Sequence, residues 1–204
     1  MRNVWKLLPV VLVCVFLVTG CGKGQATPKA TIQKMADAVK SGDRAAFIEC
    51  FDATDERKPL LNATADMIFE TKKLDDACTS KFGDSWDMSG RGPGSNPFKN
   101  LNADDAEITI DGDKATAKFK DGPGTMPMMK VGGVWKITTD DMPTGEDRDQ
   151  AVQMMTAMAE VMKAVRADVE AGKVTTADDV KKALSARMMQ AMMQGRDMEE
   201  ETED

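Results

Sequence analysis

The alternation of apolar and polar residues over residues 106–120 constrains the fold more than any other feature of the chain. Apolar residues at every second position place one face of a strand in a core and the other face in water. Asp111 and Gly112 interrupt the run, and this pair favours the backbone angles of a tight hairpin turn. Residues 125–139 repeat the pattern around Gly132. The sequence therefore predicts two consecutive β-hairpins that form an antiparallel sheet with one buried face.

Helical periodicity flanks the sheet segment on both sides. Before the sheet, Thr27 suits an N-cap and Pro28 suits the first turn of a helix, and a further long helix is expected over residues 56–78. After the sheet, residues 143–196 carry two apolar stripes at helical spacing, separated by a turn. The chain is therefore expected to be α+β, with N-terminal helices packed on a bent, cone-like antiparallel sheet and a C-terminal α-helical hairpin.

Two segments are predicted to lie outside the helices and strands. Residues 83–105 are dense in Gly, Ser, Asn and Pro, which predicts a long surface loop. Their Gly-rich part lacks the Gly-Lys-Ser/Thr ending of a phosphate-binding loop, so no nucleotide site is expected there. Residues 197–204 are acidic and are expected to form a disordered tail.

The first residues of the chain have the layout of an export signal. Arg2 and Lys6 precede an apolar run at residues 7–18, which is shorter than the ~20 residues of a membrane span. The following residues, Val18-Thr19-Gly20-Cys21, resemble the lipobox of bacterial lipoproteins. This resemblance implies that residues 1–20 are a cleaved signal peptide and that Cys21 carries a diacylglyceryl group and, usually, an N-terminal acyl chain such as palmitate. The alternative is an ordinary signal peptide with a chance cysteine.

The lipobox resemblance also implies a location and an order of domains. The protein is expected in the bacterial cell envelope, held on the membrane by its N-terminal lipid and facing the periplasm. Gly22 favours the outer membrane over the inner one. Residues 21–27 then form a tether, residues 28–142 the α+β domain and residues 143–196 the helical hairpin.

Charge and missing residue types exclude several functions. The chain has 27 basic and 34 acidic residues, and loss of Arg2 and Lys6 leaves 25 − 34 = −9. So acidic a chain is a poor nucleic-acid binder, because phosphate contacts need a basic surface. The absence of His and Tyr excludes triads with a His base and His-ligated metal sites. No catalytic residue, cofactor or metal is predicted, and neighbouring acids are expected at caps or solvated faces: Asp75-Asp76, Asp104-Asp105 and Asp140-Asp141.

Two cysteines remain in the mature chain beside Cys21. Cys50 and Cys78 form an even pair, and an oxidising compartment permits a disulfide between them. The alternative is two buried free thiols, since cysteine is frequently a small apolar core residue. We expect the disulfide.

The order of elements is similar to that of the SnoaL-like, or nuclear transport factor 2-like, superfamily. The residues that carry the similarity are "MADAVKSGDRAAFIECF" and "GDKATAKF…MKVGGVWKI". The resemblance implies a sheet wrapped on helices around a conical pocket, and we expect Phe47, Phe51 and Trp135 near that pocket. Phe47, Cys50 and Phe51 are expected on one face of the second helix. Known enzymes of the superfamily work with Tyr or His in the cone, and this chain has neither.

The resulting expectation is a non-catalytic binding module for a small apolar ligand or a protein partner. Two alternatives stay open. One is an enzyme with a carboxylate base in the cone, which requires a buried acid with a raised pKa. The other is a structural spacer that oligomerises through its C-terminal hairpin.

Methionines are concentrated in the predicted hairpin. Their i, i+4 spacing brings thioethers together, and thioethers are ligands for Cu(I). The same spacing is what a buried helix face requires, so we expect packing rather than metal binding. The two helices are expected to pack on each other through these side chains and to leave some exposed for a partner or a second copy. Of the 17 methionines in the chain, the ones concerned are Met154, Met155, Met158, Met162, Met188, Met189, Met192 and Met193.

Overall fold

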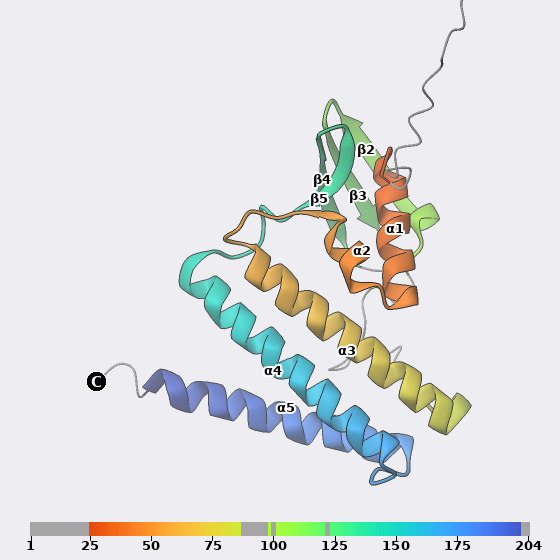
Figure 1. Ribbon diagram of the computed structural model, residues 1–204, viewed down its shortest axis with the longest axis vertical. Coiled ribbons are helices and arrows are strands. Elements are labelled where there is room, and N and C mark those ends of the chain that lie inside the picture. Colours follow the sequence, from red (N-terminus) through yellow and green to blue (C-terminus); the bar gives the residue numbers. More distant parts are fainter. Residues whose placement is uncertain (1–24, 87–97, 99–100, 121–122, 201–204) are drawn as a thin grey trace, which may run out of the picture.

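The computed structural model describes residues 25–86, 98, 101–120 and 123–200, without the side chains of 194–200. Helices precede and follow a five-stranded sheet within these residues, which confirms the predicted α+β class (Figure 1). The predicted signal peptide and lipidation site lie outside the described residues. The elements are α1 (Pro28–Ser41), α2 (Arg44–Ile48), β1 (Phe51–Asp52), α3 (Lys58–Phe82), β2 (Ala106–Asp111), β3 (Lys114–Phe119), β4 (Thr125–Val131), β5 (Val134–Thr138), α4 (Gly145–Glu170) and α5 (Ala177–Glu200).

The sheet is built from the two predicted hairpins. Asp111 lies opposite Lys114 in the β2–β3 hairpin, and Val131 lies opposite Val134 in the β4–β5 hairpin. Gly112 has a φ angle of 58°, the left-handed conformation that glycine adopts without steric cost. The short strand β1 joins β5 in parallel, so the order is β1-β5-β4-β3-β2. This parallel pair makes the sheet mixed, whereas the sequence predicted an antiparallel one.

One face of the sheet is covered by α1 and forms what we call the sheet core. Thr27 caps α1 as predicted, because its Oγ1 accepts a hydrogen bond from Ala30 N at 3.1 Å. Thr31 Oγ1 donates to the carbonyl of Trp135 at 2.8 Å and ties the helix to β5. The buried residues of this core come from α1, α2, the first half of α3 and the strands, and they include Ile32, Met35, Phe47, Leu61, Ile68, Phe69, Ala117, Phe119, Met128, Trp135 and Ile137.

A second cluster, the helical core, lies where α3, α4 and α5 meet. Figure 1 shows α4 running beside α3 and α5 crossing at the end of the molecule away from the sheet. The C-terminal helices therefore pack on α3 as well as on each other. The buried residues of this core are Leu74, Cys78, Trp86, Val161, Met162, Val165, Val169, Ala177, Val180, Leu184 and Met188.

The long helix α3 belongs to both cores. Phe69 is buried in the sheet core, Leu74 is buried in the helical core, and the buried Thr71 lies between them. With 25 residues, α3 is about 37 Å long. The expected boundary at residue 142 therefore does not separate two independent cores. No helix in the described part of the chain is long and apolar enough to cross a membrane.

Two predicted boundaries are wrong. The second helix was expected to carry Phe47, Cys50 and Phe51 on one face, but α2 ends at Ile48 and Phe51 begins β1. The reason is a hydrogen bond from Ile137 N to the carbonyl of Cys50 at 2.9 Å, which joins this segment to β5. At the other end, α5 continues to Glu200 through the first half of the predicted disordered tail, residues 197–204.

Candidate functional site

The three aromatic residues expected at a conical pocket pack inside the sheet core. Phe47 is 1% exposed, and its ring lies 5.0 Å from that of Phe51, 5.7 Å from Phe69 and 6.0 Å from Phe98, measured between centroids. Trp135 is also buried. Aromatic rings at these distances and tilts stabilise each other and fill volume. The structure therefore uses these residues as core, and neither of the two hollows described next is lined by Phe47, Phe51 or Trp135.

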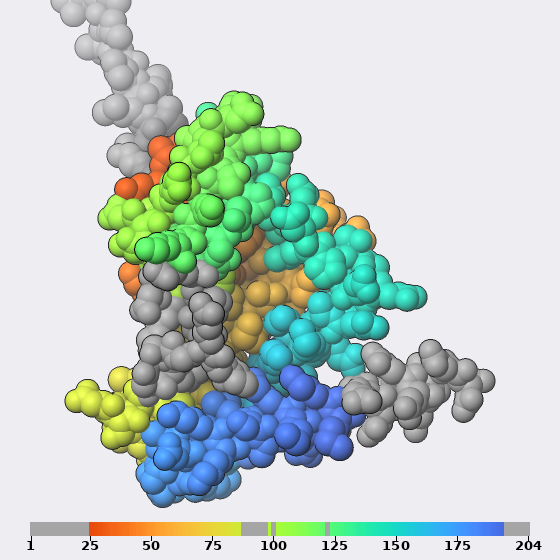
Figure 2. Space-filling view, turned by 180° about the vertical axis from the view of Figure 1, so that it is seen from behind, coloured from red at the N-terminus to blue at the C-terminus, as the bar shows by residue number. Residues whose placement is uncertain are grey.

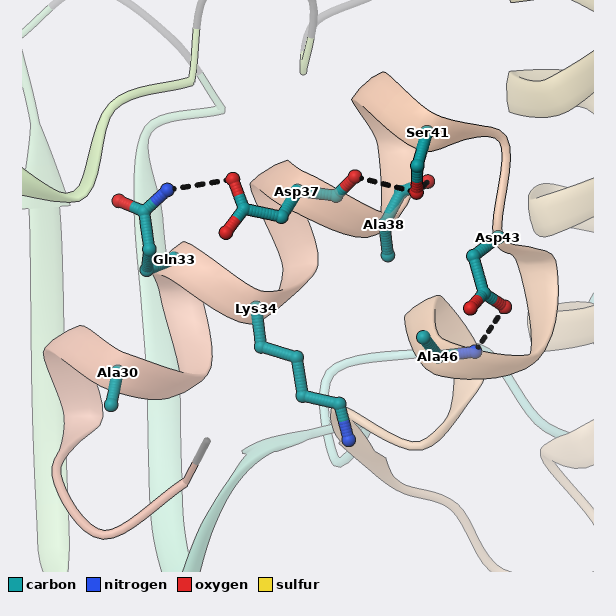
Figure 3. Close-up of a pocket in the computed structure, with 8 residues that line it drawn as sticks. All are labelled: Ala30, Gln33, Lys34, Asp37, Ala38, Ser41, Asp43 and Ala46. Atoms are coloured by element: carbon teal, nitrogen blue, oxygen red, sulfur yellow. Dashed lines mark hydrogen bonds between the residues drawn. The ribbon is translucent and has the colours of Figure 1, made fainter. Parts of the chain in front are cut away.

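The first hollow, about 450 Å³, lies between α1 and α2 (Figure 3). Its polar side chains form hydrogen bonds and ion pairs with nearby residues of the protein. Gln33 donates to Asp37 at 2.8 Å along α1, and Asp43 accepts from Ala46 N at 2.9 Å as the N-cap of α2. Lys34 reaches Glu49 at 2.8 Å. These groups serve helix structure, and they do not converge on a common point where a polar ligand would bind.

The second hollow, about 270 Å³, lies where α2 and α3 meet α4. Each cation that lines it has an acidic partner that also lines it. The pairs are Arg44 with Asp66 at 2.6 Å, Lys73 with Glu70 at 2.6 Å and Lys163 with Glu160 at 3.3 Å. Because each positive charge is paired with a negative one, the lining of this hollow does not favour a ligand of either charge.

The carboxylates that are most enclosed by α4 and its neighbours are held by cations. The side chains of Glu70 and Asp168 are each 16% exposed. Glu70 pairs with Arg166 at 3.3 Å as well as with Lys73. Lys173 and Arg187 hydrogen-bond to Asp168 and hold the pKa of its carboxyl below the ordinary value. A general base needs a carboxyl with a raised pKa, and the pKa of Asp168 is shifted in the opposite direction.

The neighbouring acid pairs also have structural partners. Asp75 accepts from Trp86 Nε1 at 2.9 Å, and one acid of each neighbouring pair forms an ion pair at the surface. No group of three His, Cys, Asp or Glu side chains suited to a metal ion occurs among the described residues. The surface pairs are Asp76 with Lys72, Asp104 with Lys29 and Asp140 with Arg57.

The structure does not bring Cys50 and Cys78 together, which corrects the expected disulfide. Both are free and buried, Cys50 in the sheet core and Cys78 in the helical core. Cys50 Sγ lies 3.3 Å from the carbonyl oxygen of Ala46, to which it donates. Burial raises the pKa of Cys50 to about 11 and that of Cys78 to about 12. The thiols are separated because α3 carries Cys78 into the second core, and this could not be read from an even cysteine count.

The most distinctive surface feature is an apolar face of α5, which we call the methionine face: Met189, Met192 and Met193. Their exposed fractions are 66%, 58% and 62%, whereas the adjacent Met188 is 6% exposed. Residues at i, i+3 and i+4 are neighbours on a helix, so these three side chains share one side of α5. Val180, Leu184 and Met188 form the buried stripe of α5, which packs in the helical core beside the methionine face. The helical core therefore holds α5 without using the methionine face.

The methionine face lies at one end of an elongated molecule. Figure 2 shows α5 at the opposite end from the hairpins of the sheet. Another methionine, Met154 on α4, is 47% exposed, while Met162 on the same helix is fully buried. The prediction that hairpin methionines pack, with some left exposed, is thus confirmed, because Met162 and Met188 are buried and Met189, Met192 and Met193 are exposed.

The chain was compared with protein families, curated proteins and solved structures. No family model, no curated protein and no solved structure matches the chain.

Proposed function

We propose that the protein is a lipid-anchored component of the bacterial cell envelope that binds a protein partner through the methionine face of α5. The observation that carries the proposal is the exposure of Met189, Met192 and Met193 on the side of α5 that the fold does not use. Exposed apolar side chains that cluster on one surface are characteristic of interaction sites. Methionine is suited to such a site because its flexible thioether adapts to the shape of a partner.

The partner is a protein with an apolar groove bordered by Lys and Arg. Six of the eight residues 197–204, which begin four positions after Met193, are acidic, and the mature chain is expected to have a net charge of −9. A basic rim complements this charge and speeds encounter at low salt. A second copy of the chain would bring like charges to the same contact. The spacer that oligomerises through its hairpin is therefore less well supported.

The other functions considered from the sequence have weaker support. A small apolar ligand needs a lined cavity, and Phe47 and Trp135 are buried as packing residues. A carboxylate enzyme needs an enclosed acid with a raised pKa, and Asp168 is instead held in its charged form by Lys173 and Arg187. Membrane attachment through Cys21 rests on the lipobox resemblance.

A site-specific crosslinking experiment tests the binding surface. A photo-reactive amino acid is placed at position 189 or, as a matched control, at the exposed Met154 on α4. A partner captured from envelope membranes only at position 189 is then purified, and its affinity is measured by titration calorimetry. Changing Met189, Met192 and Met193 to Ser should weaken binding at least about tenfold, since each buried methionine contributes ~1.5–3 kcal/mol. Unchanged affinity, or equal capture at position 154, would overturn the proposal.

Two further arms separate the alternatives. Titration with Cu(I) against a competing chelator should show no tight stoichiometric binding, whereas binding that the three Ser substitutions abolish would favour the metal site. For the anchor, the full chain and its Cys21→Ser variant are fractionated, and the N-terminal peptide is weighed by mass spectrometry. We expect an acylated peptide and membrane partition for the full chain only.

A further inference from the structure

Gln25 is the first residue that the structure describes, and it lies four positions after the predicted lipidation site in the sequence. Gln25 is 9% exposed, and its carbonyl accepts a hydrogen bond from Trp135 N at 2.9 Å. Its side-chain Nε2 donates to the carbonyls of Glu49 at 3.3 Å and Trp135 at 3.4 Å. Two residues later Thr27 caps α1. The expected tether of residues 21–27 is therefore shortened, because its last residues belong to the fold.

The short connection restricts where the fold can lie relative to a bilayer. Four peptide steps separate Cys21 from Gln25. Each step spans at most ~3.3–3.6 Å, so a fully extended connection reaches about 14 Å. Acyl chains on Cys21 are buried in the hydrocarbon, so Gln25 lies within that distance of the lipid surface.

Both hairpin turns of the sheet lie at the same end of the molecule as Gln25, and we call this end the turn end. Trp135, which binds Gln25, is the second residue of β5, directly after the β4–β5 turn. Lys130 N donates to the carbonyl of Asp113 at 2.8 Å, which places the β2–β3 turn beside the β4–β5 turn. Figure 1 shows α1 beginning at this end and α5 lying at the other.

The surface of the turn end suits the interface of a bilayer. Ile110 is 56% exposed, an unusual position for a large apolar side chain on a strand whose neighbour Ala115 is buried. Lys114 and Lys130 are exposed on strands next to the two turns, and long lysine side chains place their charge at the headgroups while their stems lie along apolar surface. Asp111 and Asp113 lie at the β2–β3 turn, and their charges offset those of the two lysines. Net charge therefore gives this end little attraction for anionic lipid, and contact depends on the anchor and on Ile110.

We propose that the turn end rests against the lipid surface, with Ile110 at the headgroup boundary, and that the methionine face points away from the membrane. This inference rests on lipidation of Cys21 in the proposed function. It deepens that function, because it presents α5 to a partner in the aqueous space and withholds the sheet turns from any soluble partner.

The test uses the acylated full chain in phosphatidylcholine vesicles that contain a nitroxide-labelled lipid. A single fluorophore is attached by brief labelling to Ile110→Cys or, as the matched control, to Met189→Cys, because the buried Cys50 and Cys78 react only after local opening. We expect the nitroxide lipid to quench the label at position 110 and to leave the label at position 189 unquenched. Adding anionic lipid should change neither result, because the turn end carries balanced charges.

A linker variant tests the role of the short connection. An insert of about twelve Gly and Ser residues between Gly24 and Gln25 adds roughly 20 Å of reach, and it should reduce quenching at position 110. Equal quenching at both positions, or quenching at neither, in protein shown by mass spectrometry to be acylated would overturn this inference and leave the anchor intact. An N-terminus without acyl chains would instead overturn the anchor, and this inference with it. Binding by the methionine face is measured separately and is unaffected by either result.

Discussion

The sheet core and the helical core use apolar side chains in different ways. The sheet core is enclosed, since α1, α2 and α3 cover one face of the strands and Ile32, Met35 and Phe47 are almost completely buried. The helical core is open on its outer side, because α5 contributes only one stripe to it. An enclosed core fixes the identity of nearly every residue that faces it. A helix at the edge of a bundle has a second side whose residues the fold does not determine.

The outer side of α5 shows what this freedom allows. Its first half carries Lys181 and Lys182, the charged residues expected on a solvated helix, and its second half carries Met189, Met192 and Met193. The same helix therefore has an ordinary surface and an apolar one, although its packed side continues from Val180 to Met188. The difference indicates that the methionine face is not a requirement of folding.

The largest effect is expected in the enclosed core. Phe47→Ala removes a ring that contacts Phe51, Phe69 and Phe98, and it should lower the free energy of unfolding by ~3–5 kcal/mol. Urea denaturation followed by circular dichroism measures the change. The exposed Ile110→Ala serves as the control and should change stability by no more than about 0.5 kcal/mol. A loss below about 1 kcal/mol for Phe47→Ala would mean that the sheet core is not tightly packed there.

Adjacent methionines on α5 should separate packing from surface. Met188→Ala should lower the free energy of unfolding by ~2–5 kcal/mol, because Met188 is buried in the helical core. Met189→Ala, one residue further on, should change it by no more than about 0.5 kcal/mol. The pair has matched composition, and the measurement is again urea denaturation. Similar losses for both variants would show that the methionine face is covered within the chain.

The smallest effect concerns the two thiols, one in each core. Burial holds the pKa of Cys50 and Cys78 above the 9.0 of an exposed thiol, so alkylation of the native protein at pH 8 requires local opening. We expect Cys78 to react first, since α5 can detach without disrupting the sheet. Peptide mass spectrometry over time gives both rates, and faster labelling of Cys50 would reverse the comparison.

The same thiols give a dependence on pH with a definite sign. Their folded pKa values are raised, so the folded state holds the proton more tightly than the unfolded state. The free energy of unfolding should be unaffected below pH 9 and should fall as pH rises from 9 toward 11.

In the unfolded chain without reductant, alkylation should add one group at each of the two cysteines. If neither Cys50 nor Cys78 were alkylated, the result would support the disulfide predicted from the sequence.

The sequence predicted the elements better than it predicted their assembly. Local signals were sufficient for the cap at Thr27 and the turn at Gly112. The partition of α3 between two cores was missed, because its apolar stripe is continuous and does not indicate which partner covers which half. The Gly-rich surroundings of Trp86 predict a surface loop, yet Trp86 is buried in the helical core and donates a hydrogen bond to Asp75 on α3.

The candidate site was predictable only in part. Methionines at i, i+4 spacing indicated a helix face, but Met188 and Met189 are neighbours in a run of identical residues and only the direction of packing separates them. The aromatic residues show the reverse case. Phe47 and Trp135 are aromatic, as residues that line apolar pockets are. Their burial in the core depends on the volume between α1 and the strands, which the spacing of residues in the sequence does not reveal.

The sharing of α3 has a consequence for the order in which the chain is made. Lys81, near the end of α3, donates to the carbonyl of Val169, 88 residues further along the chain. Leu74 and Cys78 are likewise covered by residues of α4 and α5, which are synthesised later. During synthesis, half of a long helix is therefore left uncovered until the last part of the protein has emerged. A nascent chain stopped after β5 would contain every element of the sheet core, and it would still expose the apolar second half of α3 to aggregation with other chains.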